Sequence, residues 1–146
     1  MNEFIGVWEI KAWEAQRGNE IFYPYGKSPK GYLTYLSDTK MMTVVMRDRS
    51  EIPDIFNTYN PLDVTDEECV TSFKAYMSYW GSYKIDYDAS MITHKLEGCW
   101  YPKWVGTIQE RHFEFKNGLL ILSFEIDDIH TDLTWQKIPS ALDKKS

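Results

Sequence analysis

The sequence has few cysteines, few basic residues and no long hydrophobic run. Cys69 and Cys99 are the two cysteines among 146 residues. Their spacing fits neither a metal motif nor a disulfide framework, so we expect free thiols and a cytoplasmic protein. Lys and Arg total 16 against 22 Asp and Glu, for a net charge of −6, which disfavours nucleic acid and anionic membranes as partners. No apolar run approaches the roughly 20 residues of a membrane helix, and the N-terminus does not resemble a signal peptide.

Several motifs for cofactor and nucleophile chemistry are also missing. The sequence has no Gly-rich phosphate loop and no G-x-S-x-G nucleophile elbow. His94, His112 and His130 do not show the spacing that metal ligands need. We therefore expect no cofactor and no metal.

Aromatic residues, in contrast, are abundant. Six Trp, ten Tyr and seven Phe make up 16% of the chain. Such side chains combine a large apolar area with a polar group on Tyr and Trp. Composition alone is compatible with a tightly packed core and with a cavity lined by aromatic rings.

Alternation of apolar and polar residues with a period of two recurs through most of the chain. This pattern is typical of half-buried antiparallel strands. Asn117-Gly118, between two alternating segments, is a strong hairpin signal. The eight predicted strands cover residues 7–14, 31–36, 41–47, 80–87, 91–98, 107–116, 119–126 and 131–138.

One segment instead has helical spacing. Thr65 and Glu68 form the pattern of a capping box, and Val70, Phe73 and Met77 follow at helical intervals. This pattern predicts one short α-helix at about residues 66–78, preceded by a long loop.

Eight strands, one helix and short hairpins predict an all-β fold, an eight-stranded antiparallel up-and-down barrel. Closure removes the exposed edges of a long sheet, and eight strands leave room for packed side chains or for one small ligand. An open sandwich is the alternative. We expect a single domain over residues 1–138 and a frayed C-terminal tail over residues 139–146.

Several sequence blocks carry a family resemblance. Together they resemble the bacterial and fungal lipocalin-like domain family, over nearly the whole chain. The resemblance implies a calycin-type eight-stranded barrel, but no defined reaction. The blocks are Gly6-Val7-Trp8, YPYGKSPKGYLTY at 23–35, VMRDR at 45–49, FKAYMSYWGSY at 73–83, THKLEG at 93–98 and PKWVGTIQERHFEF at 102–115.

Arg111 is the leading candidate for a functional residue. In the predicted strand it alternates in step with Phe113 and Phe115, so all three side chains share one face, which should point into the barrel. A buried Arg costs several kcal/mol unless it is paired or stacked. The resemblance to lipocalins implies a structural stack on Trp8 at the closed end. The alternative is a cation that binds a ligand carboxylate or enolate oxygen.

His94 lies on the same predicted face as Ile92 and Leu96, so it should also point inward. It is either a hydrogen-bonded core histidine or a general acid or base. Gln109 is inward by the same parity, and the hydroxyl groups of Tyr83 and Tyr35 could add donors. A few polar groups among aromatic rings are typical of a ligand site.

Further ligand-lining candidates are apolar. Trp100 and Trp104 lie in the WYPKW connection between two strands, either as a lid at the barrel mouth or as a cover over the core. Met46 suits an adaptable pocket but also plain core packing, and Phe113 is inward by parity.

These observations predict a protein that binds a small apolar or aromatic molecule in its barrel, without nucleic acid or membrane partners. The alternative is an enzyme: barrels that this one resembles sometimes catalyse cofactor-independent cyclisation, isomerisation or dehydration in secondary metabolism. His94 would then move a proton, and Arg111 or Tyr83 would stabilise an oxyanion. A filled barrel without a ligand is a third interpretation. The sequence also leaves open whether the protein forms a homodimer.

Overall fold

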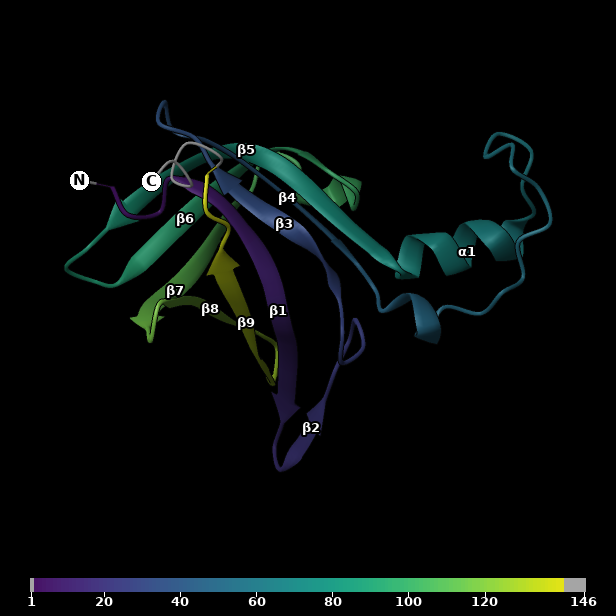
Figure 1. Cartoon of the computed structure of the whole chain (residues 1–146), viewed down its shortest axis with the longest axis horizontal. Coiled ribbons are helices and arrows are strands. Elements are labelled where there is room, and N and C mark those ends of the chain that lie inside the picture. Colours follow the sequence, from purple (N-terminus) through teal and green to yellow (C-terminus); the bar gives the residue numbers. More distant parts are fainter. Residues whose placement is uncertain (1, 141–146) are drawn as a thin grey trace.

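The computed structural model describes residues 2–140, which form nine strands, one α-helix and two short 3-10 helices (Figure 1). The helices are α1 (Asp66–Lys74), η1 (Arg49–Glu51) and η2 (Pro102–Trp104). The strands are β1 (Gly6–Arg17), β2 (Glu20–Phe22), β3 (Lys30–Tyr35), β4 (Lys40–Met46), β5 (Tyr76–Asp86), β6 (Met91–Cys99), β7 (Ile108–Lys116), β8 (Leu119–Ile126) and β9 (Ile129–Lys137).

The strands form a closed antiparallel barrel, which confirms the predicted fold. The hydrogen-bonded order is β2-β1-β3-β4-β5-β6-β7-β8-β9, and β1 also pairs with β9. The alternative of an open sandwich is therefore wrong. The short strand β2 was not predicted, because its three residues cannot show a period; it extends β1 as a hairpin beyond the barrel wall.

A β-bulge in β1 determines which of its residues face inward. Trp8 and Ile10 are buried, but the register shifts between Ile10 and Ala12, after which Trp13 and Ala15 are buried. Because a bulge adds one residue, the inward positions change from even to odd numbers. This shift brings the indole of Trp13 into the barrel.

Helix α1 begins as predicted but ends earlier than expected. The amide of Glu68 donates to Thr65 Oγ1 over 3.1 Å, and the amide of Thr65 donates to Glu68 Oε1 over 3.0 Å, which confirms the capping box. The helix ends at Lys74 rather than at residue 78, because Tyr76 already pairs with Met46 in the β4–β5 ladder.

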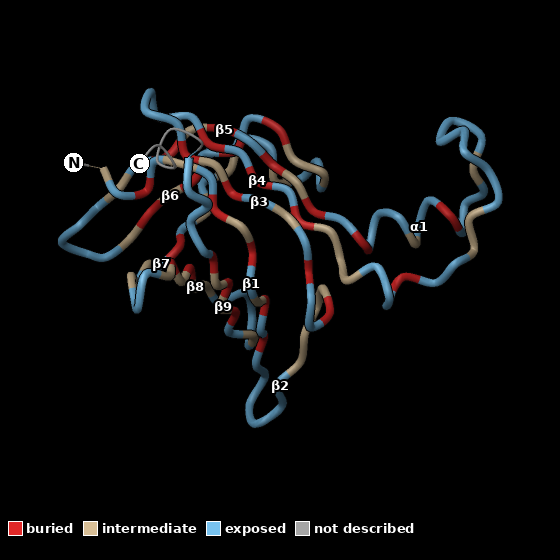
Figure 2. Tube along the Cα trace, in the orientation of Figure 1, coloured by how far each residue is buried: buried red, intermediate tan, exposed pale blue. Residues whose placement is uncertain are grey.

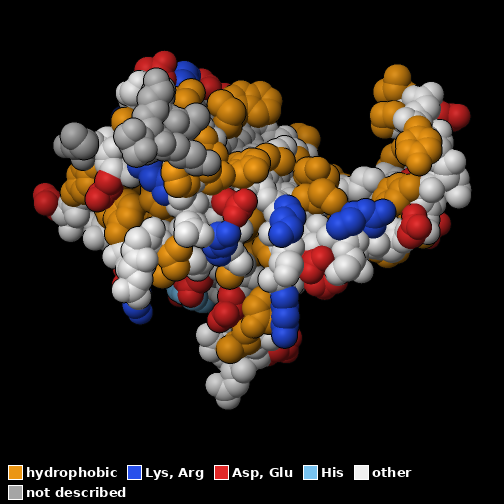
Figure 3. Space-filling view, in the orientation of Figure 1, with side chains coloured by type: hydrophobic (Ala, Val, Ile, Leu, Met, Phe, Trp, Pro, Cys, Tyr) orange, Lys and Arg blue, Asp and Glu red, His pale blue; other side chains and the backbone are white. Residues whose placement is uncertain are grey.

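The connection between β4 and β5, which carries α1, stands out from the barrel (Figures 1 and 3). Most of its residues are exposed (Figure 2). The large side chains of Tyr59 and Leu62 are among them. At the other end of the sheet, residues 138–140 have no regular structure, and the rest of the predicted frayed tail lies outside the described residues. No helix in the described chain is long and apolar enough to cross a membrane.

One end of the barrel is closed by aromatic packing. The ring of Phe4 makes edge contacts with Tyr35, Phe113 and Phe115 at centroid distances of 5.0–5.6 Å. The Trp8 indole donates to the Phe4 carbonyl over 2.8 Å. The closed end is therefore filled by packed aromatic rings around Phe4.

Candidate functional site

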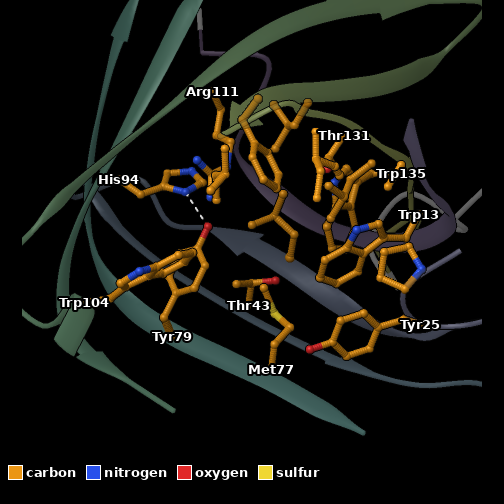
Figure 4. A pocket seen from close by; sticks show the side chains of 18 of the residues that line it. Trp13, Tyr25, Thr43, Met77, Tyr79, His94, Trp104, Arg111, Thr131 and Trp135 are labelled. Atoms are coloured by element: carbon orange, nitrogen blue, oxygen red, sulfur yellow. Dashed lines mark hydrogen bonds between the residues drawn. The ribbon is translucent and has the colours of Figure 1, made fainter. Parts of the chain in front are cut away.

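The open half of the barrel contains a cavity of about 410 Å³ (Figure 4). This volume lies within the ~300–1,000 Å³ typical of small-molecule pockets. The barrel is therefore not filled by its own side chains. Most of the cavity wall is apolar, including the side chains of Trp13, Leu33, Met77, Leu122, Phe124 and Trp135.

Aromatic residues from connecting segments surround the mouth of the cavity. The ring of Tyr25 stacks on Trp13 at a centroid distance of 4.1 Å. Trp100 and Trp104, from the connection between β6 and β7, meet edge to face at 5.8 Å, and both line the cavity. Such flat side chains can stack on a planar ligand.

His94 lies at the floor of the cavity, between two tyrosines. Its Nδ1 is 2.8 Å from the hydroxyl of Tyr79, and its Nε2 is 2.7 Å from the hydroxyl of Tyr35. The first of these bonds faces the cavity in Figure 4. Tyr35 is fully buried below it and belongs to the closed-end core. Both imidazole nitrogens are therefore occupied by protein hydroxyl groups.

Burial holds His94 neutral. The imidazole is 1% exposed, and this burial, together with the nearby positive charge of Arg111, lowers its pKa from 6.5 to about 3. A neutral imidazole has one donor and one acceptor nitrogen. One tyrosine hydroxyl therefore donates to His94 and the other accepts from it.

Arg111 is a buried cation in the cavity wall. It is 6% exposed, and no ion pair reaches it within residues 2–140. Its Nη1 donates to the Glu110 carbonyl over 2.9 Å, and its Cζ lies 4.0 Å from the centre of the Phe124 ring. These contacts satisfy part of the guanidinium but do not neutralise its charge.

The structural stack of Arg111 on Trp8 that the resemblance implied is wrong. Arg111 stacks on Phe124 instead, and Lys137 Nζ lies 5.4 Å from the centre of the Trp8 ring. The inward face of β7 holds Arg111 in the cavity half of the barrel, whereas Trp8 belongs to the closed-end core.

Arg111 also influences the hydroxyl groups around His94. Burial raises the pKa of the Tyr79 and Tyr35 hydroxyls, and the positive charge of Arg111 opposes part of this rise. Both hydroxyls remain protonated near neutral pH, and the one that accepts from His94 keeps its own proton for another acceptor. The cavity floor thus offers a guanidinium and a phenol hydroxyl close together (Figure 4).

The structure brings some of the predicted site residues together and separates others. His94, Arg111, Trp100 and Trp104 line the cavity. Gln109 does not: it is half-buried, and its amide donates to Thr107 Oγ1 over 2.8 Å. Its side chain does lie on the inward face of β7, as predicted, but near the start of the strand, beside an outer cleft.

The other predicted residues that miss the cavity belong to different parts of the barrel. The Tyr83 hydroxyl donates to the Leu36 carbonyl over 2.7 Å in the closed half, so it cannot reach a ligand in the cavity. Phe113 packs against Phe4 at the same end. Met46 lies at the end of β4, half-buried and opposite Tyr76, outside the cavity.

Many residues of the cavity wall were missed from the sequence; among them, Tyr79 contacts His94 and Phe124 contacts Arg111. Tyr79 was missed because the helix was predicted to run to residue 78 and the next strand to begin at Trp80. The strand begins at Tyr76, so Tyr79 belongs to it. Phe124 alternates with Leu120 and Leu122 in β8, and this parity could have identified it. Within the described residues, no group of three or more His, Cys, Asp or Glu side chains is arranged to hold a metal ion.

Comparisons with known proteins identify one matching family and several similar proteins. The family model described as lipocalin-like domain matches residues 5–138. The 4'-hydroxy-3'-methoxypropiophenone carrier protein of Aspergillus oryzae is 34% identical over 90 residues, covering 53% of this chain and 81% of that protein. Among solved structures, the wild-type fluorescent protein UnaG matches with a TM-score of 0.42 and 12% identity, over 93% of this chain and 98% of that one.

Proposed function

The chain belongs to the lipocalin-like domain family, and on this basis we propose that it binds one small aromatic molecule in the barrel cavity. An acidic or carbonyl oxygen of the ligand accepts hydrogen bonds from Arg111. The aromatic ring of the ligand lies among the apolar side chains of the cavity. A polyketide-type aromatic secondary metabolite has this chemistry.

The observation that carries the proposal is the guanidinium of Arg111 in the wall of an apolar cavity, with no carboxylate beside it in the described chain. Taking such a charge out of water costs several kcal/mol. A ligand oxygen with full or partial negative charge offsets this cost through a charge-assisted hydrogen bond.

The comparison with the carrier protein supports the same ligand class. The compound in the name of that relative has an aromatic ring, a ketone and a phenol. Such a molecule is planar and carries oxygen atoms at opposite ends. It therefore suits a cavity with aromatic walls and one cationic group.

The environment of His94 favours binding over acid–base catalysis by this residue. A general acid or base works best with a pKa near the operating pH. The pKa of His94 is lowered to about 3, and both ring nitrogens already contact tyrosine hydroxyls. Tyr83, the other proposed oxyanion donor, is bonded to the Leu36 carbonyl outside the cavity.

Tryptophan fluorescence offers a direct test. Trp13, Trp100, Trp104 and Trp135 line the cavity, so a bound aromatic ketone should quench their emission. We expect saturable quenching by 4'-hydroxy-3'-methoxypropiophenone with a stoichiometry of about one molecule per chain, because the cavity has room for a single ligand of this size. Quenching that rises linearly without saturation would contradict the proposal.

A further inference from the structure

The ladder between β7 and β8 covers only part of each strand. Pairing runs from His112 opposite Ser123 to Lys116 opposite Leu119. Beyond Ser123 the two strands separate, so that residues 108–111 and 124–126 have no partner across this boundary. Each strand stays paired on its other side, with β6 and β9 respectively. The wall of the barrel therefore has a seam here, which we call the β7–β8 seam.

A cleft of about 560 Å³ occupies the β7–β8 seam. Residues from both faces of the barrel wall line it. Gln109, Arg111, Phe124 and Ile126 come from the inward-facing positions, whereas Glu110 and Glu125 come from the outward-facing ones. The cleft therefore borders residues of both faces of the wall at the place where the two strands separate.

The cleft and the central cavity share part of their lining. Arg111, Phe124 and Ile126 border both spaces. The stacked pair of Arg111 and Phe124, with the guanidinium 4.0 Å from the ring centre, lies where the two spaces meet. A ligand oxygen at Arg111 therefore lies next to the seam, and a substituent near that oxygen can continue outward.

The charges across the wall have opposite signs on its two sides. The inner end of the cleft carries the nine-tenths-buried Arg111. The outer end carries the carboxylates of Glu110 and Glu125, together with the imidazoles of His112 and His130. His130 Nδ1 lies 3.3 Å from Glu125 Oε1, and its Nε2 lies 2.9 Å from Asp132 Oδ1. Such a gradient disfavours an anionic group at the outer end and favours an ammonium or hydroxyl group.

We propose that the β7–β8 seam is a second ligand subsite, continuous with the cavity across Arg111, which receives an amine- or hydroxyl-bearing side chain of the aromatic ligand. This inference rests on the proposed function, because the ring of the ligand occupies the central cavity. It extends the ligand class from a simple aromatic ketone or phenol to one with a polar, non-anionic side chain near the oxygen that Arg111 binds.

The test compares three aryl alkyl ketones whose chains have equal length and end in a methyl, an ammonium or a hydroxyl group. Binding to the full chain is measured by tryptophan quenching. We expect the ammonium compound to bind about tenfold more tightly than the methyl compound. The double substitution Glu110→Gln and Glu125→Gln should remove most of this preference, since both side chains are exposed and outside the cavity.

A steric variant tests the location independently of charge. Gln109 lines the cleft but not the cavity, so Gln109→Trp should block the seam while leaving the central site intact. We expect this variant to lower the affinity for the ammonium compound by about tenfold and the affinity for the methyl compound by less than about twofold. Glu114→Trp is the matched control, because this exposed β7 residue borders neither space and should change neither affinity.

The outcomes separate the two proposals. Saturable binding of the methyl compound, with no preference for the ammonium chain over the methyl chain, would overturn the seam subsite and leave the proposed function in place. Equal weakening of all three compounds by Gln109→Trp would also overturn the subsite. If even the methyl compound fails to bind, the cavity is not the ligand site, and both proposals are wrong.

Discussion

The guanidinium of Arg111 stacks on the ring of Phe124 at 4.0 Å, and no carboxylate pairs with it anywhere in residues 2–140. Burial of a charge costs several kcal/mol of hydration free energy. A desolvated cation–π contact contributes about 2 kcal/mol, which offsets only part of this cost. The buried charge of Arg111 therefore lowers the stability of the folded protein, as is common for groups that bind a ligand.

Replacement of Arg111 by Met tests this cost. Met has similar length and no charge, so we expect the free energy of unfolding to stay unchanged or to rise by about 1–2 kcal/mol. Urea denaturation of the ligand-free protein measures this difference. A loss of about 3 kcal/mol or more would assign Arg111 a structural role instead.

Stability should fall in mild acid because of His94. The pKa of this imidazole is lowered from 6.5 to about 3 in the folded protein. Below pH 6.5 the unfolded chain takes up a proton that the folded chain does not, so each pH unit costs about 1.4 kcal/mol until the folded pKa is reached. We expect a loss of about 2 kcal/mol at about pH 5, measured by urea denaturation.

Two variants isolate this effect from the titration of other groups. His94→Asn should remove the part of the pH dependence that His94 causes, whereas His112→Asn, at an exposed β7 position, should leave it unchanged. If wild type and His94→Asn lose stability in parallel between about pH 7 and about pH 5, the imidazole is not held neutral.

The two tyrosines beside His94 should differ in their effect on stability. Tyr35 is fully buried below the cavity floor, whereas Tyr79 borders the cavity. Tyr35→Phe leaves a nitrogen of His94 without a partner in the solid core, which costs about 1–3 kcal/mol. Tyr79→Phe should cost less, because water in the cavity can reach the other nitrogen. Equal losses in thermal denaturation of the two variants would contradict this arrangement.

The capping box should hold α1 in place within the projecting β4–β5 connection. Thr65→Ala removes the acceptor for the Glu68 amide, and such a change costs about 1 kcal/mol of helix stability. We expect faster proteolysis between residues 53 and 75 with little change in the thermal midpoint of the barrel. Thr58→Ala, outside the box, is the control. A large drop in the midpoint for Thr65→Ala would show that the barrel depends on the helix.

The barrel was predictable because period-two alternation persists over long segments such as β7, where Arg111 and Phe113 share the inner face. The limits of the strands were less predictable. Helical spacing at Val70 and Phe73 continues by chance to Met77, but pairing of Tyr76 with Met46 takes precedence over it. The prediction of the helix therefore concealed Tyr79, which completes the hydrogen bonds of His94.

The alternation of residues along a strand shows which side chains point inward, but it cannot show how far along the barrel axis they lie. Tyr83 and Phe113 do lie on inner faces, but they belong to the closed end, whereas His94 and Arg111 lie at the cavity. Depth depends on the register between strands and on strand tilt, which a single sequence does not reveal. The β7–β8 seam was equally hidden, because both strands continue their alternation through the region where they separate.

Isothermal titration of 4'-hydroxy-3'-methoxypropiophenone into the wild type and into Arg111→Met tests the central claim most directly. Butylbenzene, which has no oxygen, serves as the control ligand. The account predicts saturable binding to the wild type, at least about tenfold weaker binding of the ketone to the variant, and unchanged binding of butylbenzene. Equal affinity of the ketone for both proteins, or no saturable binding to the wild type, would contradict it.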